Sequence, residues 1–277
     1  MKEITHPNII MHKPSGIRDY VIALLLASAL TIFMGCYLLI RRGYMFDAPL
    51  TADTLYVPNK VIVGTGMILL ALTFLIGPIA RYFDHFDKWL SYRKEIGIVG
   101  GFFVFFHAII SYFFLPIKFP QSSMALDSLT FGSGLIGTFL LIFLFILSFK
   151  KITQLIEGSR WWFLQRMGLR MVILVALIHV YSMKWNGWMK WLKQGGTPTT
   201  ELANPQMAGL GILVMLFVTW VVIVRLYESF FLFKSFGVIP KDISQDQQRK
   251  VYGRRFVIWS FLTLIILYFF VLTRWTW

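Results

Sequence analysis

The 277-residue chain contains few charged side chains and almost no cysteine. Charged residues make up 14% of the sequence, and hydrophobic residues make up 57%. Soluble globular domains carry about a quarter charged residues, so the composition excludes an ordinary soluble domain. The single cysteine, Cys36, excludes an internal disulfide and a cysteine-ligated metal cluster. The composition therefore predicts a membrane protein in contact with lipid.

Acidic residues are especially scarce, with 13 Asp and Glu against 27 Lys and Arg. The basic residues lie in short stretches between apolar segments and form no continuous basic face, which argues against nucleic-acid binding. We find no G-x-G-x-x-G context, phosphate loop, paired carboxylates or row of acidic residues inside the apolar segments. Arg225 and Glu228 stand three apart near the end of one apolar segment, which predicts an interfacial ion pair.

Seven apolar segments are long enough to cross a bilayer, which needs about 20 residues. We therefore expect an all-α, polytopic transmembrane helix bundle. A polar stretch, residues 239–255, is expected to connect the sixth and seventh segments. The segments cover about residues 19–40, 60–80, 96–117, 131–149, 169–189, 207–231 and 256–273.

The positions of Lys and Arg predict the orientation of the chain. The N-terminal tail and every second loop after it hold eighteen of them, and the opposite side holds eight. This bias predicts a cytoplasmic N-terminus and a C-terminus outside. Arg41 and Arg42 run against the bias, because they fall on the side with fewer basic residues.

Two histidines, His107 and His179, lie within apolar segments three and five. His107 stands fourteen residues beyond Arg93, and His179 stands fourteen residues beyond Gln165. At 1.5 Å per helical residue, each histidine would lie ~21 Å from an equivalent residue near the cytoplasmic side. Two imidazoles at one depth on parallel helices are what axial ligation of a single heme requires.

Other interpretations of these histidines are open. An intramembrane histidine can simply hydrogen-bond a neighbouring helix, and Tyr112 or Tyr181 could serve as its partner. A zinc site is disfavoured, because two histidines lack a third and a fourth ligand. The remaining histidines lie in polar segments and are expected to be solvated; they are His6, His12 and His85.

Two parts of the chain resemble one family in order and spacing. The first is "TGMILLALTFLIGPIARYF" followed by "YRKEIGIVGGFFVFFHAIISYFF", and the second is "RWWFLQRMGLRMVILVALIHVYSMKW". They are similar to helices 2, 3 and 5 of the ferric reductase-like transmembrane domain family. The branch that they resemble most is the heme-binding membrane subunit of the bacterial periplasmic methionine sulfoxide reductase system. The resemblance covers about residues 60–190.

The resemblance implies a six-helix core, here followed by a seventh helix, and one heme b. His107 and His179 match the ligands of the family's outer heme. Gln165 and Arg93 stand where relatives place inner ligands, so a second heme is not expected. The implied regions are 1–59, with the tail, first helix and outer loop; 60–233, the heme-binding core; and 234–277, the connector and extra helix.

The resemblance also implies a function in the bacterial cytoplasmic (inner) membrane. The chain would be an electron-transfer subunit of an oxidoreductase system, and its acceptor would be an extracytoplasmic redox partner or ferric iron. Because the chain lacks a flavin and nicotinamide domain, its donor would be a flavin reductase, a membrane-bound flavin or quinol. The alternatives are a heme-free transporter or channel that uses the two histidines for gating, and a heme-free structural subunit.

The position of the missing inner heme carries its own prediction. Arg93, Gln165 and Arg166, with Trp161 and Trp162 alongside, would line it near the inner interface. Their cationic and amide groups could bind the phosphate of FMN or a quinone head group. Alternatively, the arginines could extend toward lipid phosphates.

The stretch "MKWNGWMKWLK" (183–193) is expected to be an outer loop that covers the heme. Its Lys184 could pair with a heme propionate or an acidic partner, together with Lys190 and Lys193. Its tryptophans are expected to form an aromatic belt at the membrane interface.

Overall fold

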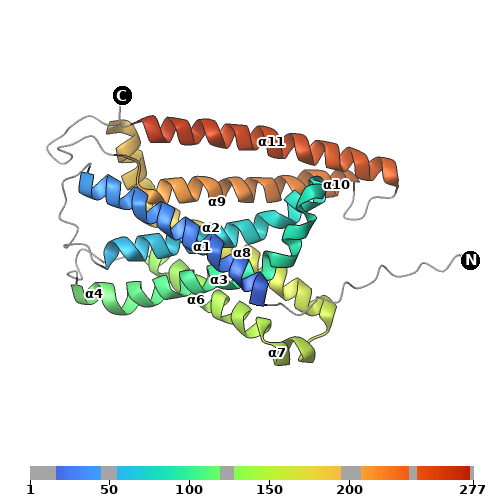
Figure 1. Cartoon of the computed structure of the whole chain (residues 1–277), viewed down its shortest axis with the longest axis horizontal. Helices are drawn as coiled ribbons and strands as arrows, with labels where there is room; N and C mark the ends of the chain where they lie inside the picture. The colour runs from blue at the N-terminus through green and yellow to red at the C-terminus, as the bar shows by residue number, and fades with distance from the viewer. Residues whose placement is uncertain (1–16, 45–54, 119–127, 195–206, 237–241, 275–277) are drawn as a thin grey trace, which may run out of the picture.

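The computed structural model describes residues 17–44, 55–118, 128–194, 207–236 and 242–274, and within them the chain is an all-α bundle (Figure 1). Seven of the described helices are long and apolar enough to cross a membrane. A helix closes its backbone hydrogen bonds within itself, which is what the bilayer interior demands. The predicted polytopic transmembrane bundle is therefore confirmed, and the chain is an integral membrane protein in contact with lipid.

Successive spans alternate in direction: α1, α3, α8 and α11 run one way, and α2, α6 and α9 run the other (Figure 1). We call the end where α3 and α8 begin the α7 end, and the end where α3 leads into α4 the α4 end. In chain order the elements are α1 (Ile17–Leu39), the π-helical η1 (Ile40–Tyr44), α2 (Tyr56–Tyr82), the 3-10 helix η3 (Asp84–Tyr92), α3 (Arg93–Ile109), the π-helical η4 (Ile110–Phe114), α4 (Leu115–Lys118), α6 (Ser128–Ser148), α7 (Lys150–Leu155), α8 (Gly158–Gln194), α9 (Leu210–Tyr227), the π-helical η5 (Glu228–Leu232), α10 (Phe233–Phe236) and α11 (Ile243–Thr273).

Helix α2 is the centre of the bundle and contacts α1, α3, α8, α9 and α11. Within its most apolar stretch 67% of the residues are buried, against 17–44% for the other spans. Glycines let α3 approach it closely. A Cβ atom on Gly66 would lie 2.9 Å from the carbonyl oxygen of Gly100, so any larger residue there would push the two helices apart.

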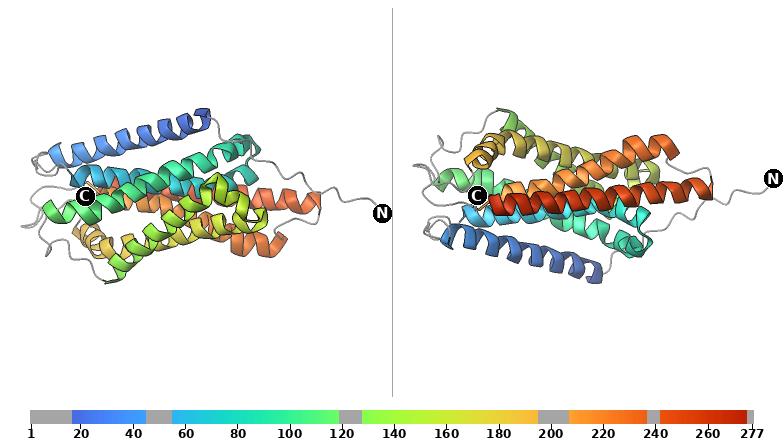
Figure 2. Two further views of the ribbon diagram at one scale, coloured as in Figure 1. Left: turned by 90° about the horizontal axis from the view of Figure 1, so that it is seen from below. Right: turned by 90° about the horizontal axis from the view of Figure 1, so that it is seen from above.

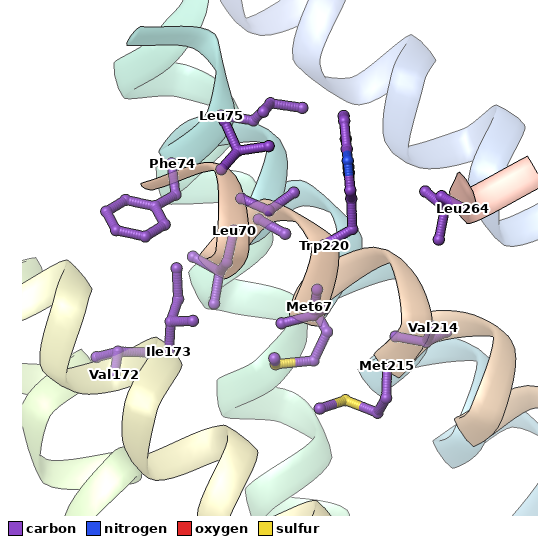
Figure 3. Close-up of a cluster of buried hydrophobic side chains, with 14 of the residues drawn as sticks. Met67, Leu70, Phe74, Leu75, Val172, Ile173, Val214, Met215, Trp220 and Leu264 are labelled. Carbon is purple, nitrogen blue, oxygen red and sulfur yellow. The ribbon is translucent and has the colours of Figure 1, made fainter. Parts of the chain in front are cut away.

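A buried apolar cluster joins α2 to α8, α9 and α11 (Figure 3). Helix α1 lies at one edge of the bundle, and the α6–α8 pair lies at the opposite edge (Figure 2). The cluster therefore fills the middle of the bundle between these edges. Its labelled members are Met67, Leu70, Phe74, Leu75, Val172, Ile173, Val214, Met215, Trp220 and Leu264.

Two helices extend well beyond their apolar segments. Helix α8 covers Gly158–Gln194, whereas the apolar pattern marked only 169–189. Helix α11 begins at Ile243, so much of the stretch expected as a connector is helical. Asp242 caps this helix, because its Oδ1 accepts the Gln245 backbone N–H at 2.8 Å. Asp246 then pairs with Arg249 at 2.7 Å, one turn further on. Polar residues with a cap and i,i+3 pairs can thus continue a helix past the apolar part.

Candidate functional site around His107 and His179

Helices α3 and α8 face one another across the bundle. Each of them contacts α2 and α6, while they make few contacts with each other. His107 lies in the last turn of α3, and His179 lies in the middle of α8. The two imidazoles are close enough for their charges to interact. Both helices are uninterrupted from Arg93 to His107 and from Gln165 to His179, as the matched spacing requires.

His107 is held by an amide group on α2. Its Nδ1 lies 3.0 Å from the Oδ1 atom of Asn59, a residue that is 3% exposed. The Asn59 Nδ2 group donates to Ser111 Oγ at 3.0 Å, which fixes the amide with its oxygen toward the histidine. An amide oxygen only accepts hydrogen bonds. The neutral His107 ring therefore carries its proton on Nδ1 and keeps a lone pair on Nε2.

His179 has the same arrangement on α6. Its Nδ1 lies 2.8 Å from the backbone carbonyl oxygen of Thr130, so Nδ1 is again the donor. Gly134, one turn along α6, makes room for the ring. A Cβ atom at Gly134 would lie 3.0 Å from both Cε1 and Nδ1 of His179. Ser182 continues the polar contact between α6 and α8, since its Oγ lies 2.8 Å from Thr130 Oγ1.

The two histidines thus share one hydrogen-bonding state. Each uses Nδ1 toward an oxygen, and within the described residues neither Nε2 has a hydrogen-bond partner. This is the usual state of a histidine that binds a metal, whose second ring N–H donates to a carbonyl or carboxylate oxygen. Among the described residues no three His, Cys, Asp or Glu side chains come together. The pair therefore suits a metal group that needs only two protein ligands.

The tyrosines that sequence offered as histidine partners do not fill this role. Tyr112 is 60% exposed, and the Tyr181 hydroxyl bonds Thr219 Oγ1 at 3.0 Å. The actual partners, Asn59 and Thr130, escaped the sequence analysis. Asn59 is visible as the one amide near the start of the second apolar segment. A backbone carbonyl such as that of Thr130 leaves no signal in a sequence.

The residues expected to line the position of an inner heme lie at the α7 end. Gln165 Nε2 donates to Ser148 Oγ at 3.3 Å, which ties α8 to α6. Arg93 donates from Nε to the Thr73 carbonyl oxygen at 2.8 Å, and the charge of Arg166 acts on it. Trp161 lies beside this position, because its Nε1 donates to the Leu147 carbonyl oxygen at 2.7 Å. Trp162 stacks edge-on against Trp161, with ring centroids 5.1 Å apart.

A buried ion-pair cluster that extends the predicted Arg225–Glu228 pair lies at the same end. Arg225 Nη1 donates to Glu228 Oε2 at 2.6 Å, as the spacing predicted. Glu228 is 1% exposed, and its other oxygen accepts from both Arg81 and the Tyr82 hydroxyl. Sequence spacing found the pair within one helix and missed the two partners on α2. The π-helical segment η5 begins at Glu228 itself.

The stretch 183–193, expected as an outer loop, is helical and forms the end of α8. Lys184 is partly exposed and has no hydrogen bond or ion pair with a described residue. Trp191 is 7% exposed, and Trp188 packs on Gly211 of α9. These two tryptophans therefore join helices inside the bundle, and Trp185, half exposed, is the one that fits an interfacial belt. Because helix α8 continues through residues 183–193, these two tryptophans lie against neighbouring helices instead of in a loop.

No family model matches the chain. The family resemblance of the sequence thus stays a prediction, and the functional argument depends on the side chains described above.

Proposed function

We propose that the chain is a b-type cytochrome subunit that carries electrons across a membrane, with one heme b between His107 and His179. The observation that carries the proposal is the shared state of the two imidazoles. Both are oriented by a hydrogen bond at Nδ1 and both keep Nε2 available. Two such rings on opposite helices, close enough to interact, suit the two axial positions of one heme.

The chain's own residues would orient the ligands and protect the site. Asn59 and Thr130 hold the proton of each imidazole at Nδ1, which makes Nε2 a better electron-pair donor. Neutral imidazoles avoid placing a charge in the apolar interior. Gly134 leaves the space in which the His179 ring lies. When bound, heme would supply a one-electron carrier whose potential depends on these ligands and on burial.

The family resemblance and the charge bias together suggest the setting. The chain would belong to the ferric reductase-like transmembrane domain family and lie in the bacterial cytoplasmic membrane. The α7 end, which holds most of the basic residues, would face the cytoplasm. The donor would be a flavin reductase, a membrane-bound flavin or quinol, and the acceptor an extracytoplasmic redox partner or ferric iron. Lys184, five residues beyond His179, would be available to pair with an acidic partner or a propionate.

The decisive experiment uses histidine variants and absorption spectra. His107→Ala and His179→Ala should each abolish the low-spin spectrum of the dithionite-reduced protein, because each removes one axial ligand. His85→Ala is the matched control, since His85 is exposed in η3 and its variant should keep the spectrum. A normal spectrum from both membrane variants would move the heme to another site. Absence of any b-type spectrum after heme supplementation would favour a transporter or a heme-free subunit.

A further inference from the structure

Four arginine side chains from four helices lie at the α7 end, and two of them pair with one carboxylate. They come from α2, α3, α8 and α9, and the charges of the other three act on the arginine of α3, Arg93. Both oxygens of the carboxylate, Glu228, are already used by Arg81 and Arg225. The cluster therefore carries an excess of positive charge within the bundle. Its arginines are Arg81, Arg93, Arg166 and Arg225.

Helix α2 brings two of these arginines together. The Thr73 carbonyl oxygen accepts Arg93 Nε at 2.8 Å. Gly77, four residues on, faces the Arg225 guanidinium, whose Nη atoms lie 3.7 and 3.8 Å from where its Cβ would be. Residues four apart share one face of a helix, about 5.4 Å apart along its axis. Arg93 and Arg225 therefore approach the same face of α2, about one turn apart.

These two guanidinium groups have donors that nothing in the described structure uses. Arg93 donates only from Nε, to the Thr73 carbonyl oxygen, and it forms no ion pair with a carboxylate among the described residues. The Nε atom of Arg225 is buried, and it has no hydrogen-bond partner among the described residues. Buried donors of a charged group are costly to leave unpaired. The Arg225 guanidinium lies over the Phe74 ring, with Cζ 4.4 Å from the ring centroid, and beside Gly77, which has no side chain.

We infer that Arg93 and Arg225 form the core of a binding site for a phosphate monoester, with Arg166 and Arg81 adding charge around it. Guanidinium groups bind phosphate oxygens with pairs of parallel hydrogen bonds, which matches the unused donors. A phosphate monoester carries about −1.5 to −2 charge at pH 7 and would offset most of the excess. The phosphate could belong to the headgroup of an anionic lipid or to a soluble molecule. The inference stands whether or not the histidines bind heme.

The first measurement uses the unmodified full-length chain in phosphatidylcholine nanodiscs. In one arm, radiolabelled inorganic phosphate is titrated in equilibrium dialysis against a chloride control of equal ionic strength. In the other arm, the nanodiscs contain a small fraction of phosphatidic acid, and native mass spectrometry counts the lipids that stay bound. Saturable binding of one phosphate-bearing molecule per chain is expected in at least one arm. The arm that responds identifies the source of the phosphate.

Single arginine variants then test whether the phosphate binds at Arg93 and Arg225. Arg93→Gln and Arg225→Gln should each weaken binding about tenfold or more, because each removes charge-assisted hydrogen bonds. Arg254→Gln is the matched control: Arg254 lies at the same end but pairs with Asp84 in an exposed position, so affinity should not change. Arg93→Lys keeps the charge and loses the planar fork, so it should bind with intermediate affinity. This conservative variant keeps the test valid if Arg225→Gln fails to fold.

Two results would overturn the inference. One is the absence of saturable binding in both arms with the unmodified chain, which needs no variant. The other is equal phosphate affinity in Arg93→Gln and Arg254→Gln, which would mean that surface charge alone attracts the anion.

Discussion

We call the half of the bundle toward the α4 end the α4 half and the other the α7 half. The two halves differ in the charge of their polar side chains and in which hydrogen-bonding groups are left without a partner. Around His107 and His179 the buried groups are neutral, each ring N–H meets an oxygen, and an electron-pair donor is left over on each ring. Around Glu228 the groups are charged, both oxygens of this carboxylate are used, and N–H donors are left over on Arg93 and Arg225. The first site is suited to a group that accepts electron pairs, and the second to an anion.

The largest effect is expected from removing the carboxylate that pairs with Arg81 and Arg225 in the α7 half. Glu228→Gln keeps the side-chain volume and leaves Arg81 and Arg225 without a counter-charge. Because Glu228 is 1% exposed, we expect a loss of about 3–5 kcal/mol in the free energy of unfolding. Thermal unfolding followed by tryptophan fluorescence would measure it. Asp84→Asn is the control, since Asp84 pairs with Lys250 and Arg254 at an exposed position and its variant should change the midpoint little.

A smaller effect is expected from the amide that holds His107. Asn59→Leu removes the nearer acceptor for Nδ1 and leaves only Ser111 Oγ, 3.4 Å away, which weakens Nε2 as a ligand and loosens the ring. Loss of such a partner typically costs 10–100-fold in metal affinity, so heme affinity should fall by about that factor and the midpoint potential should rise. Heme titration and a redox titration measure the two quantities. Thr73→Val on the same helix removes a hydroxyl bonded only to its own helix, and should change neither.

A still smaller effect is expected at Gly134. The added methyl group of Gly134→Ala would meet the His179 ring at 3.0 Å, so the ring must shift by a few tenths of an ångström. We expect the hydrogen bond to Thr130 to lengthen and heme affinity to fall several-fold. Gly132→Ala on the same helix is a close control, because a Cβ there meets nothing within 4 Å. Equal heme affinity in both variants would show that α6 does not position the ring.

The smallest effect is expected from restoring the family's histidine at position 165. Gln165→His should leave heme stoichiometry at one, because Arg93, the residue expected at the second inner-ligand position, cannot ligate iron, and Ser148 merely loses a weak hydrogen bond. A pyridine hemochrome assay would check this. If the variant bound two hemes, only the ligand at position 165 would have been missing, and the α7 half would be a vacant heme site and not an anion site.

The sequence predicted the features that depend on one helix at a time. Apolar length gave the seven spans, and i,i+3 spacing gave the Arg225–Glu228 pair. The equal offsets to His107 and His179 require unbroken helices, which α3 and α8 are, and the shared depth stays a prediction. Apolar length failed for the ends of α8 and α11; for α11 the reason is that a cap and an ion pair extend the helix beyond its apolar part.

Contacts between helices could not be predicted from the sequence. The partners of the histidines, Asn59 and the Thr130 carbonyl, lie 48 and 49 residues away from them in the chain. The same holds for Arg81 and Tyr82, which approach Glu228 across the bundle. Such pairs depend on how helices rotate against each other, and here that rotation is set by packing contacts such as Gly66 against Gly100.

The heme content of the purified, unmodified chain tests the central claim most directly. A pyridine hemochrome assay, paired with oxidised and dithionite-reduced spectra, should give one heme b per chain with a low-spin reduced spectrum. His107 and His179 offer two axial nitrogens, whereas Arg93 and Gln165 offer none. A chain that stays free of heme after heme supplementation, or that binds two hemes, would contradict the account.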